Sequence, residues 1–127
     1  LRAAGVADVA VVTGRTPYEV DDGLARLGWA RSDLATIVTS DMALKPDPAC
    51  LDAVVAATGS RSLVYAGDVR DDWDLVRRFR AERDGRAGAL GVVVGPEAPA
   101  MRALGCDATL RSAAALPELL EWLRRGP

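Results

Sequence analysis

The hydrophobic positions along the chain fall into two kinds of segment that alternate. Short runs of consecutive apolar, mostly β-branched residues are separated by stretches in which apolar residues recur every three or four positions. Runs of the first kind predict strands buried on both faces, and stretches of the second kind predict amphipathic helices. Because the two kinds alternate at short intervals, the pattern predicts βα units around a parallel sheet.

The predicted elements can be placed along the whole chain. Strands are expected at 8–13, 35–39, 62–66, 89–94 and 108–110, and residues 2–5 are expected to end a helix. Further helices are expected from Thr16 to Gly28, from Asp47 to Gly59, after Asp68, at 98–104 and at 117–124. Thr16 and Glu19 have capping-box spacing with a proline between them, and glycines stand at two helix ends. We therefore expect one α/β domain over residues 1–127, a doubly wound parallel sheet of the Rossmann-like type.

Composition narrows the class of protein. The chain has 127 residues, of which 50% are hydrophobic and 27% charged, which is typical of one soluble globular domain. Sixteen basic and eighteen acidic side chains leave a net charge of −2, so neither a nucleic acid nor a membrane is expected as a partner. No apolar run approaches the ~20 residues of a membrane span and no leader opens the chain, so we expect a cytoplasmic protein.

Single residue types change the picture further. The chain has no histidine, which excludes Ser-His-Asp and Cys-His mechanisms and any His-ligated metal within these residues. Cys50 and Cys106 lack the spacing of a zinc site or a disulfide framework. Lys45 is the only lysine among the sixteen basic residues, which draws attention to its ammonium group. The three tryptophans are interpreted as packing residues; they are Trp29, Trp73 and Trp122.

Polar side chains follow three of the predicted strands at their carboxyl ends. Thr13 and Gly14 close the first strand, Lys45 lies in the loop after the second, and Asp68 and Asp72 follow the third. Ligands of open parallel sheets bind beyond the carboxyl ends of the strands. A hydroxyl, an ammonium and carboxylates at one edge suit a phosphoryl group together with a hard divalent cation.

Each of these residues also has a purely structural interpretation. Thr13 is compatible with a turn at the end of a strand, and Lys45 with a solvated loop. Asp72 suits the first turn of a helix, where the helix dipole favours a carboxylate. Asp68, directly after a glycine and an apolar strand, is explained less well in this way. The three groups in order, on consecutive βα loops, are more specific than any one of them alone.

In its motifs the chain resembles the haloacid dehalogenase superfamily, in particular the branch of the phosphoglycolate phosphatases. Val11-Val12-Thr13-Gly14 is similar to the second motif of that superfamily, and Lys45-Pro46-Asp47-Pro48 to the third. Gly67-Asp68 followed by Asp72 is similar to the fourth. The resemblance extends over about residues 5 to 123.

The resemblance implies Mg²⁺-dependent hydrolysis of phosphate monoesters, with a small phosphorylated metabolite as substrate and a phospho-aspartyl intermediate. It implies that Thr13 and Gly14 bind the phosphate, with a hydrogen bond from Thr13 to the transferring group. Lys45 would hold the charges of nucleophile and phosphate together. Asp68 would bind Mg²⁺, and Asp72 would bind it directly or through water.

The chain departs from the family at its first motif, an Asp-x-Asp pair at the end of a strand that supplies the nucleophile. No such pair precedes Thr13, and the cap that selects the substrate is absent as well. In the family's strand order the missing strand lies between 8–13 and 62–66. We therefore expect a gap there and an inactive chain when these residues stand alone. The gap could be filled by other residues of the same polypeptide, which we favour, by a second chain, or by direct pairing of the two strands.

Two other functions remain open. A non-catalytic binding or scaffold domain that has lost the nucleophile has the same sequence features. A phospho-acceptor receiver domain also uses Asp, Thr and Lys on a parallel sheet, but there the acidic residues precede the other two in the chain. Here they follow, so this interpretation ranks last.

Overall fold

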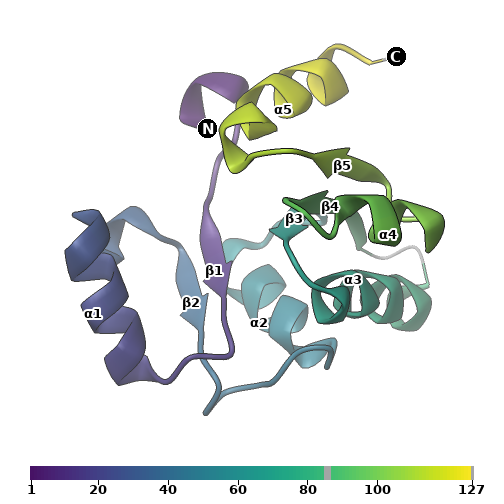
Figure 1. Ribbon diagram of the computed structural model, residues 1–127. Helices are drawn as coiled ribbons and strands as arrows, with labels where there is room; N and C mark the ends of the chain where they lie inside the picture. The colour runs from purple at the N-terminus through teal and green to yellow at the C-terminus, as the bar shows by residue number, and fades with distance from the viewer. Residues whose placement is uncertain (85–86, 127) are drawn as a thin grey trace.

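The elements follow one another as βα units in a computed structural model that describes residues 1–84 and 87–126 (Figure 1). In chain order they are η1 (Arg2–Ala4), β1 (Ala10–Val12), α1 (Pro17–Leu27), η2 (Arg31–Asp33), β2 (Thr36–Val38), α2 (Ala49–Thr58), β3 (Ser62–Gly67), α3 (Arg70–Arg83), β4 (Gly88–Val94), α4 (Ala98–Ala103), β5 (Ala108–Leu110), η3 (Ala113–Ala115) and α5 (Leu116–Arg125); η marks a 3₁₀ turn. The predicted strands are all present, as are the predicted helices from Thr16 onward, whereas the helix end expected at 2–5 is the 3₁₀ turn η1. β1 is shorter than the expected strand at 8–13.

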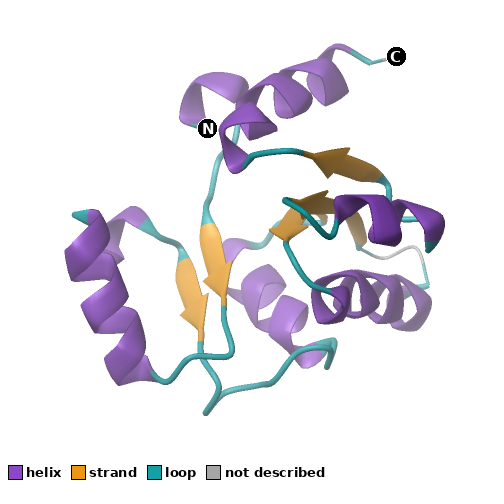
Figure 2. Ribbon diagram, in the orientation of Figure 1, coloured by secondary structure: helices purple, strands orange, loops and turns teal. Residues whose placement is uncertain are grey.

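The strands form two parallel sheets. β1 pairs with β2, and β3, β4 and β5 form the second sheet in that order, with β4 in the middle. This confirms the α/β class with parallel, Rossmann-like βα units. It differs from one continuous sheet because β1 and β3 do not pair with each other, so direct pairing does not fill the expected gap. Figure 2 shows the β1–β2 pair set apart from the other three strands.

Local sequence signals decide where the helices begin and end. Glu19 donates its backbone N–H to the Thr16 hydroxyl at 3.4 Å and its carboxylate accepts the Thr16 N–H at 2.8 Å, so the predicted capping box of α1 is confirmed. Gly28 ends α1 in the left-handed region, with φ 68°. At α2, Pro48 occupies the N-cap position instead of Asp47, whose carboxylate accepts the first helical N–H at 2.9 Å.

The core lies where α2 and α3 meet the strands. Its fully buried side chains come from β2, α2, α3 and β4, and they include Val38, Leu51, Leu75, Val76, Phe79 and Val93. Trp73 belongs to this core, and its indole N–H donates to the Leu104 carbonyl at 3.3 Å. The packing interpretation is wrong for Trp29, just after α1, and for Trp122 in α5, which are 50% and 55% exposed.

Candidate active site at the carboxyl ends of the strands

The predicted site residues lie in loops that leave the carboxyl ends of β1, β2 and β3. Thr13 follows β1 directly, Lys45 lies between β2 and α2, and Asp68 lies between β3 and α3. The loops after β1 and β2 are joined by a hydrogen bond in which the Ser40 N–H donates to the Arg15 carbonyl at 3.0 Å. The arrangement follows from the βα order, because the loops that follow parallel strands all begin at the same edge of the sheet.

Asp72 is the centre of a hydrogen-bonded cluster at this edge. It lies in the first turn of α3 and is 3% exposed. Its Oδ1 accepts from Lys45 Nζ at 2.6 Å and from the Tyr65 hydroxyl at 2.8 Å. Its Oδ2 accepts the backbone N–H groups of Asp68 at 2.9 Å and Val69 at 3.1 Å. These four bonds occupy the four acceptor positions of a carboxylate.

The cluster keeps Asp72 ionised in spite of its burial. Burial alone raises the pKa of its carboxyl, but hydrogen bonds from Lys45, Tyr65 and the Val69 N–H together outweigh burial and lower the pKa. Burial, followed by the negative charge of Asp72, raises the pKa of the Tyr65 phenol well above its ordinary value. Tyr65 therefore remains a hydroxyl that donates to Asp72.

Gly67 makes room for this carboxylate at the junction of β3 and α3. A Cβ placed on Gly67 would lie 2.2 Å from Asp72 Cγ and 2.3 Å from its Oδ2. Asp72 can reach the N–H groups of Asp68 and Val69 only because residue 67 has no side chain. The glycine at the end of this apolar strand is thus a packing requirement of the cluster.

Tyr65 was not among the residues predicted from sequence. A signal for it exists, because a tyrosine in an otherwise apolar strand needs a partner for its hydroxyl. The carboxylates closest in sequence, beyond the end of the same strand, are Asp68, Asp71 and Asp72. Only the conformation of the turn from β3 into α3 shows which of these three the hydroxyl reaches.

Thr13 and Gly14, the remaining predicted residues, make no hydrogen bond to the cluster within the described part of the chain. The half-buried Thr13 accepts a hydrogen bond at its hydroxyl from the Arg15 N–H at 3.2 Å, and Gly14 beside it is exposed. Within residues 1–84 and 87–126, no hydrogen bond joins Thr13 to Lys45 or Asp68. The phosphate-binding roles of Thr13 and Gly14 therefore stay predictions.

The residues of this edge meet the requirements of a magnesium ion only in part. Asp68 is exposed, and no hydrogen bond to its carboxylate is found among the described residues. Its hard oxygen donors suit Mg²⁺. Asp72 has its acceptor positions filled by protein donors, and the described part of the chain holds no group of three acidic or cysteine side chains that could bind a metal. Further donors would have to come from substrate, water or another segment.

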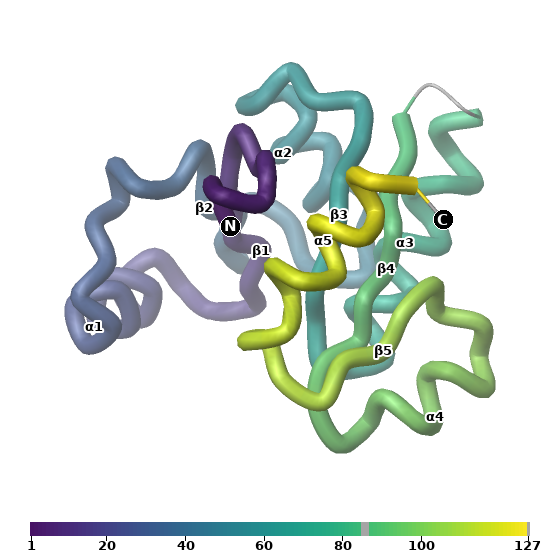
Figure 3. Tube along the Cα trace, turned by 90° about the horizontal axis from the view of Figure 1, so that it is seen from above, coloured from purple at the N-terminus to yellow at the C-terminus, as the bar shows by residue number. Residues whose placement is uncertain are grey.

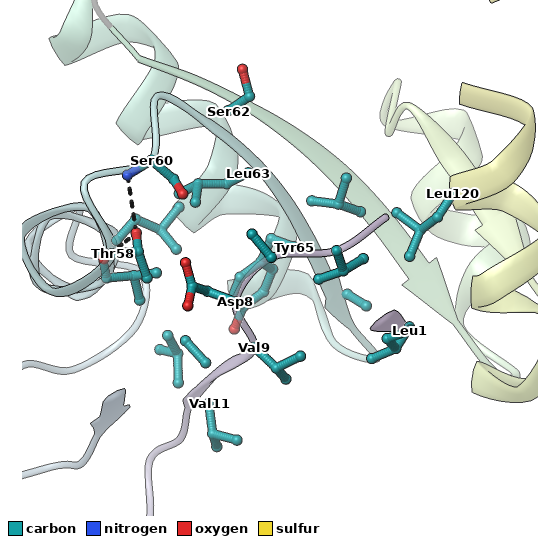
Figure 4. A pocket seen from close by; sticks show the side chains of 18 of the residues that line it. Leu1, Asp8, Val9, Val11, Thr58, Ser60, Ser62, Leu63, Tyr65 and Leu120 are labelled. Atoms are coloured by element: carbon teal, nitrogen blue, oxygen red, sulfur yellow. Dashed lines mark hydrogen bonds between the residues drawn. The ribbon is translucent and has the colours of Figure 1, made fainter. Parts of the chain in front are cut away.

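A groove separates β1 from β3 beside this cluster (Figure 4). Its volume is about 530 Å³. Its walls are β1 with the segment before it, β3, and side chains from α2 and α5, most of them apolar; they include Val9, Val11, Leu51, Leu63, Tyr65 and Leu120. Because Tyr65 lines the groove and bonds to Asp72, the groove opens next to the polar cluster.

Comparison with known proteins finds a solved structure whose three-dimensional fold is similar to that of this chain. No protein-family profile and no curated protein matches the chain. A solved structure that does match is the phosphatase Tt82 from Thermococcus thioreducens, with a TM-score of 0.65 and 25% sequence identity. The match covers 99% of this chain and 42% of the Tt82 chain, so these residues span less than half the length of that phosphatase. No helix in the described part of the chain is long and apolar enough to cross a membrane.

Proposed function

We propose that this chain is part of a phosphatase that hydrolyses phosphate monoesters of small metabolites with the help of Mg²⁺. The observation that carries the proposal is the Lys45–Asp72 ion pair beside Asp68, which unites an ammonium, a buried carboxylate and an accessible carboxylate at the carboxyl ends of the strands. The likeness to the phosphatase Tt82 along almost the whole chain supports it, as does the resemblance of the three motifs to haloacid dehalogenase phosphatases.

The chain's own residues have distinct roles in this proposal. Lys45, with one N–H given to Asp72, has further donors for a phosphoryl oxygen and for the carboxylate of a nucleophile. Thr13 donates its hydroxyl to the transferring phosphoryl group, and the exposed Gly14 allows a phosphate to approach the backbone. Asp72 holds the Lys45 ammonium in place, because its carboxylate accepts a hydrogen bond from Lys45 Nζ and is itself fixed by the Val69 N–H at the start of α3.

Asp68 would be the residue of this chain that holds Mg²⁺ directly, and Asp72, whose acceptor positions are filled by protein donors, would contact the ion through water. A bound Mg²⁺ would supply positive charge against the phosphoryl oxygens. Further oxygen donors would have to come from outside the described residues.

The nucleophile is an aspartate outside residues 1–127. Its carboxylate attacks phosphorus, and the P–O bond to the substrate alcohol breaks. The alcohol leaves with a proton donated by the second aspartate of the same Asp-x-Asp pair, which the resemblance makes the general acid/base and which also lies outside these residues. Water then hydrolyses the acyl phosphate and releases inorganic phosphate. Because the chain does not contain this aspartate, residues 1–127 alone are inactive in this proposal.

The test is an Asp68→Asn substitution in the complete protein, assayed with p-nitrophenyl phosphate and Mg²⁺. The change keeps the shape of the side chain and removes a ligand charge, so we expect activity to fall by at least ~100-fold with the fold intact by circular dichroism. Asp71→Asn, which alters the neighbouring exposed carboxylate, is the control and should retain parent activity. If Asp68→Asn hydrolyses the ester as fast as the parent, Asp68 only begins a helix. If the complete protein has no activity, the non-catalytic scaffold is the better interpretation.

A further inference from the structure

A second cavity lies beyond the carboxyl ends of β4 and β5, next to α4. α4 packs beside β5, the edge strand of its sheet (Figures 1 and 3). The volume of the cavity is about 500 Å³, and the residues that line it include Gly95, Pro96, Pro99, Arg102, Thr109 and Arg111. Neither Lys45 nor Asp68 lines it, so this cavity is separate from the candidate active site although the parallel strands place both at the same edge.

The walls of the cavity are fixed by the backbone and by prolines. The Gly95 N–H donates to the Leu110 carbonyl at 2.9 Å, which ties the loop after β4 to the end of β5. Gly95 has a φ of 98°, a conformation that residues with a side chain rarely adopt. The rings of Pro96 and Pro99 lock the backbone on the other wall. Because its walls are ordered beforehand, the cavity loses little conformational entropy when a ligand binds.

The cavity carries positive charge without a matching acid. Arg102 of α4 and Arg111 after β5 both line it, and no aspartate or glutamate is found among its described lining residues. Neither guanidinium forms an ion pair within the described part of the chain. Asp107, before β5, accepts instead from the Arg80 guanidinium and from the Gly91 N–H, the latter at 2.7 Å. Two positive charges at one cavity favour an anion within it.

The lining also indicates the chemical class of the ligand. A guanidinium binds the oxygens of a carboxylate or a phosphate through two parallel N–H groups. The half-buried Thr109 adds a hydroxyl that can donate to the same group. Pro96, Pro99 and Leu110 supply apolar surface around these donors. A cavity of this size, with apolar walls and a few polar groups, is typical of a small-molecule site.

We propose that the cavity between α4 and β5 binds a small organic anion, which carries a phosphate or carboxylate group on an apolar body. Arg102, Arg111 and the Thr109 hydroxyl bind the anionic group, and the two prolines contact the apolar body. Binding there needs neither the nucleophile nor Mg²⁺, so it is independent of the proposed phosphatase function.

The experiment titrates the complete protein with three probes and follows its backbone amide signals by NMR, with EDTA present to remove Mg²⁺. Phenylphosphonate has a phosphoryl-type anion and no ester bond to hydrolyse, benzoate has a carboxylate, and benzyl alcohol is neutral. We expect the amides of Gly95, Thr109 and Arg111 to shift along one saturable curve with at least one of the two anions, and to stay in place with benzyl alcohol. The anion that saturates the curve at the lower concentration identifies the preferred anionic group.

Arg102→Gln and Arg111→Gln test the two guanidinium groups. Both arginines are exposed, so the variants should keep the amide dispersion of the folded parent. Each should weaken binding of the anion by at least ~10-fold, because a charge-assisted hydrogen bond is lost. The matched control is Arg78→Gln, which alters an exposed arginine of α3 outside the cavity and should leave binding unchanged.

Other outcomes would overturn the proposal. Shifts that rise without saturation, or an equal loss of binding in Arg78→Gln, would show only a general attraction of anions to arginines. Equal shifts with benzyl alcohol would show an apolar depression without selectivity for charge. Shifts confined to the amides of Thr13 and Lys45, or no shifts at all, would leave the cavity without an anion. The phosphatase function is tested separately by Asp68→Asn, so failure of one does not imply failure of the other.

Discussion

At the scale of single residues, Asp72 explains why this edge of the molecule is polar yet ordered. A carboxylate that is 3% exposed is stable only when its charge is paired and its oxygens are hydrogen-bonded. Lys45 supplies the charge, and the Tyr65 hydroxyl and two backbone N–H groups supply the remaining bonds. The only lysine of the chain is therefore held by the most deeply buried of its acidic residues.

Asp72→Asn should destabilise the protein by about 2–4 kcal/mol at pH 7, because Lys45 then loses its counter-charge in a half-buried site. The pKa of Asp72 is lowered in the folded protein, so its contribution to stability is present above the ordinary value of 3.8. That contribution is lost as the pH falls through the lower folded value. Urea unfolding at pH 7 and at steps below pH 3.8 should show the difference between parent and variant shrinking with acidity.

The control for this measurement is Asp71→Asn, which should change stability by no more than ~0.5 kcal/mol because Asp71 is exposed. A difference between parent and Asp72→Asn that is as large in acid as at pH 7 would contradict the ionised state assigned to Asp72.

At the scale of elements, the junction of β3 and α3 holds the candidate site together. β3 ends at Gly67, α3 begins at Arg70, and the carboxylate of Asp72 folds back over the turn between them. This is a helix N-terminus closed by a carboxylate from its own first turn. The same side chain reaches Lys45 in the loop before α2, so one residue joins two βα loops.

Gly67→Ala should therefore destabilise the protein by about 2 kcal/mol or more, because its Cβ would overlap the Asp72 carboxylate. Gly88→Ala is the matched control: Gly88 pairs with the start of β3, and a Cβ there meets nothing within 4 Å. Urea denaturation of both variants separates the two cases. Equal free energies of unfolding of the two variants would show that the Asp72 side chain can move away from residue 67 without destabilising the protein.

At the scale of the whole molecule, the two sheets differ in how many strand pairs and core contacts stabilise them. β1 and β2 share three paired positions, and their contacts to the rest of the core run through α2. β4 lies between β3 and β5 and against α3, with Val92 and Val93 each 2% exposed. A local opening of the first sheet breaks fewer contacts than an opening of the second.

Hydrogen exchange on residues 1–127 should show this difference. We expect the amides of Ala10 and Val12 to exchange at least ~100-fold faster than those of Val92 and Val93, since the former face the groove and the latter lie in the middle of a sheet. Exchange at similar rates would mean that the groove-facing amides have a partner in the chain as it stands.

The order of strands and helices and the position of the polar residues were predictable from sequence because they depend on near neighbours. The capping box at Thr16, the glycine stop at Gly28 and the apolar runs are signals of a few residues, and the structure confirms them. A parallel βα order then sends Lys45 and Asp68 to strand ends at one edge, whatever the details of packing.

Contacts between distant segments were decided only by the tertiary structure. The bond from Tyr65 to Asp72, the filling of every acceptor position of Asp72, and the exposure of Trp29 and Trp122 depend on which elements pack together. The division into two sheets also depends on tertiary packing, because the sequences of β1 and β3 resemble those of strands that pair with each other. Hydrophobic pattern tells which residues avoid water, but only the folded chain shows which partner covers them and where a partner is still required.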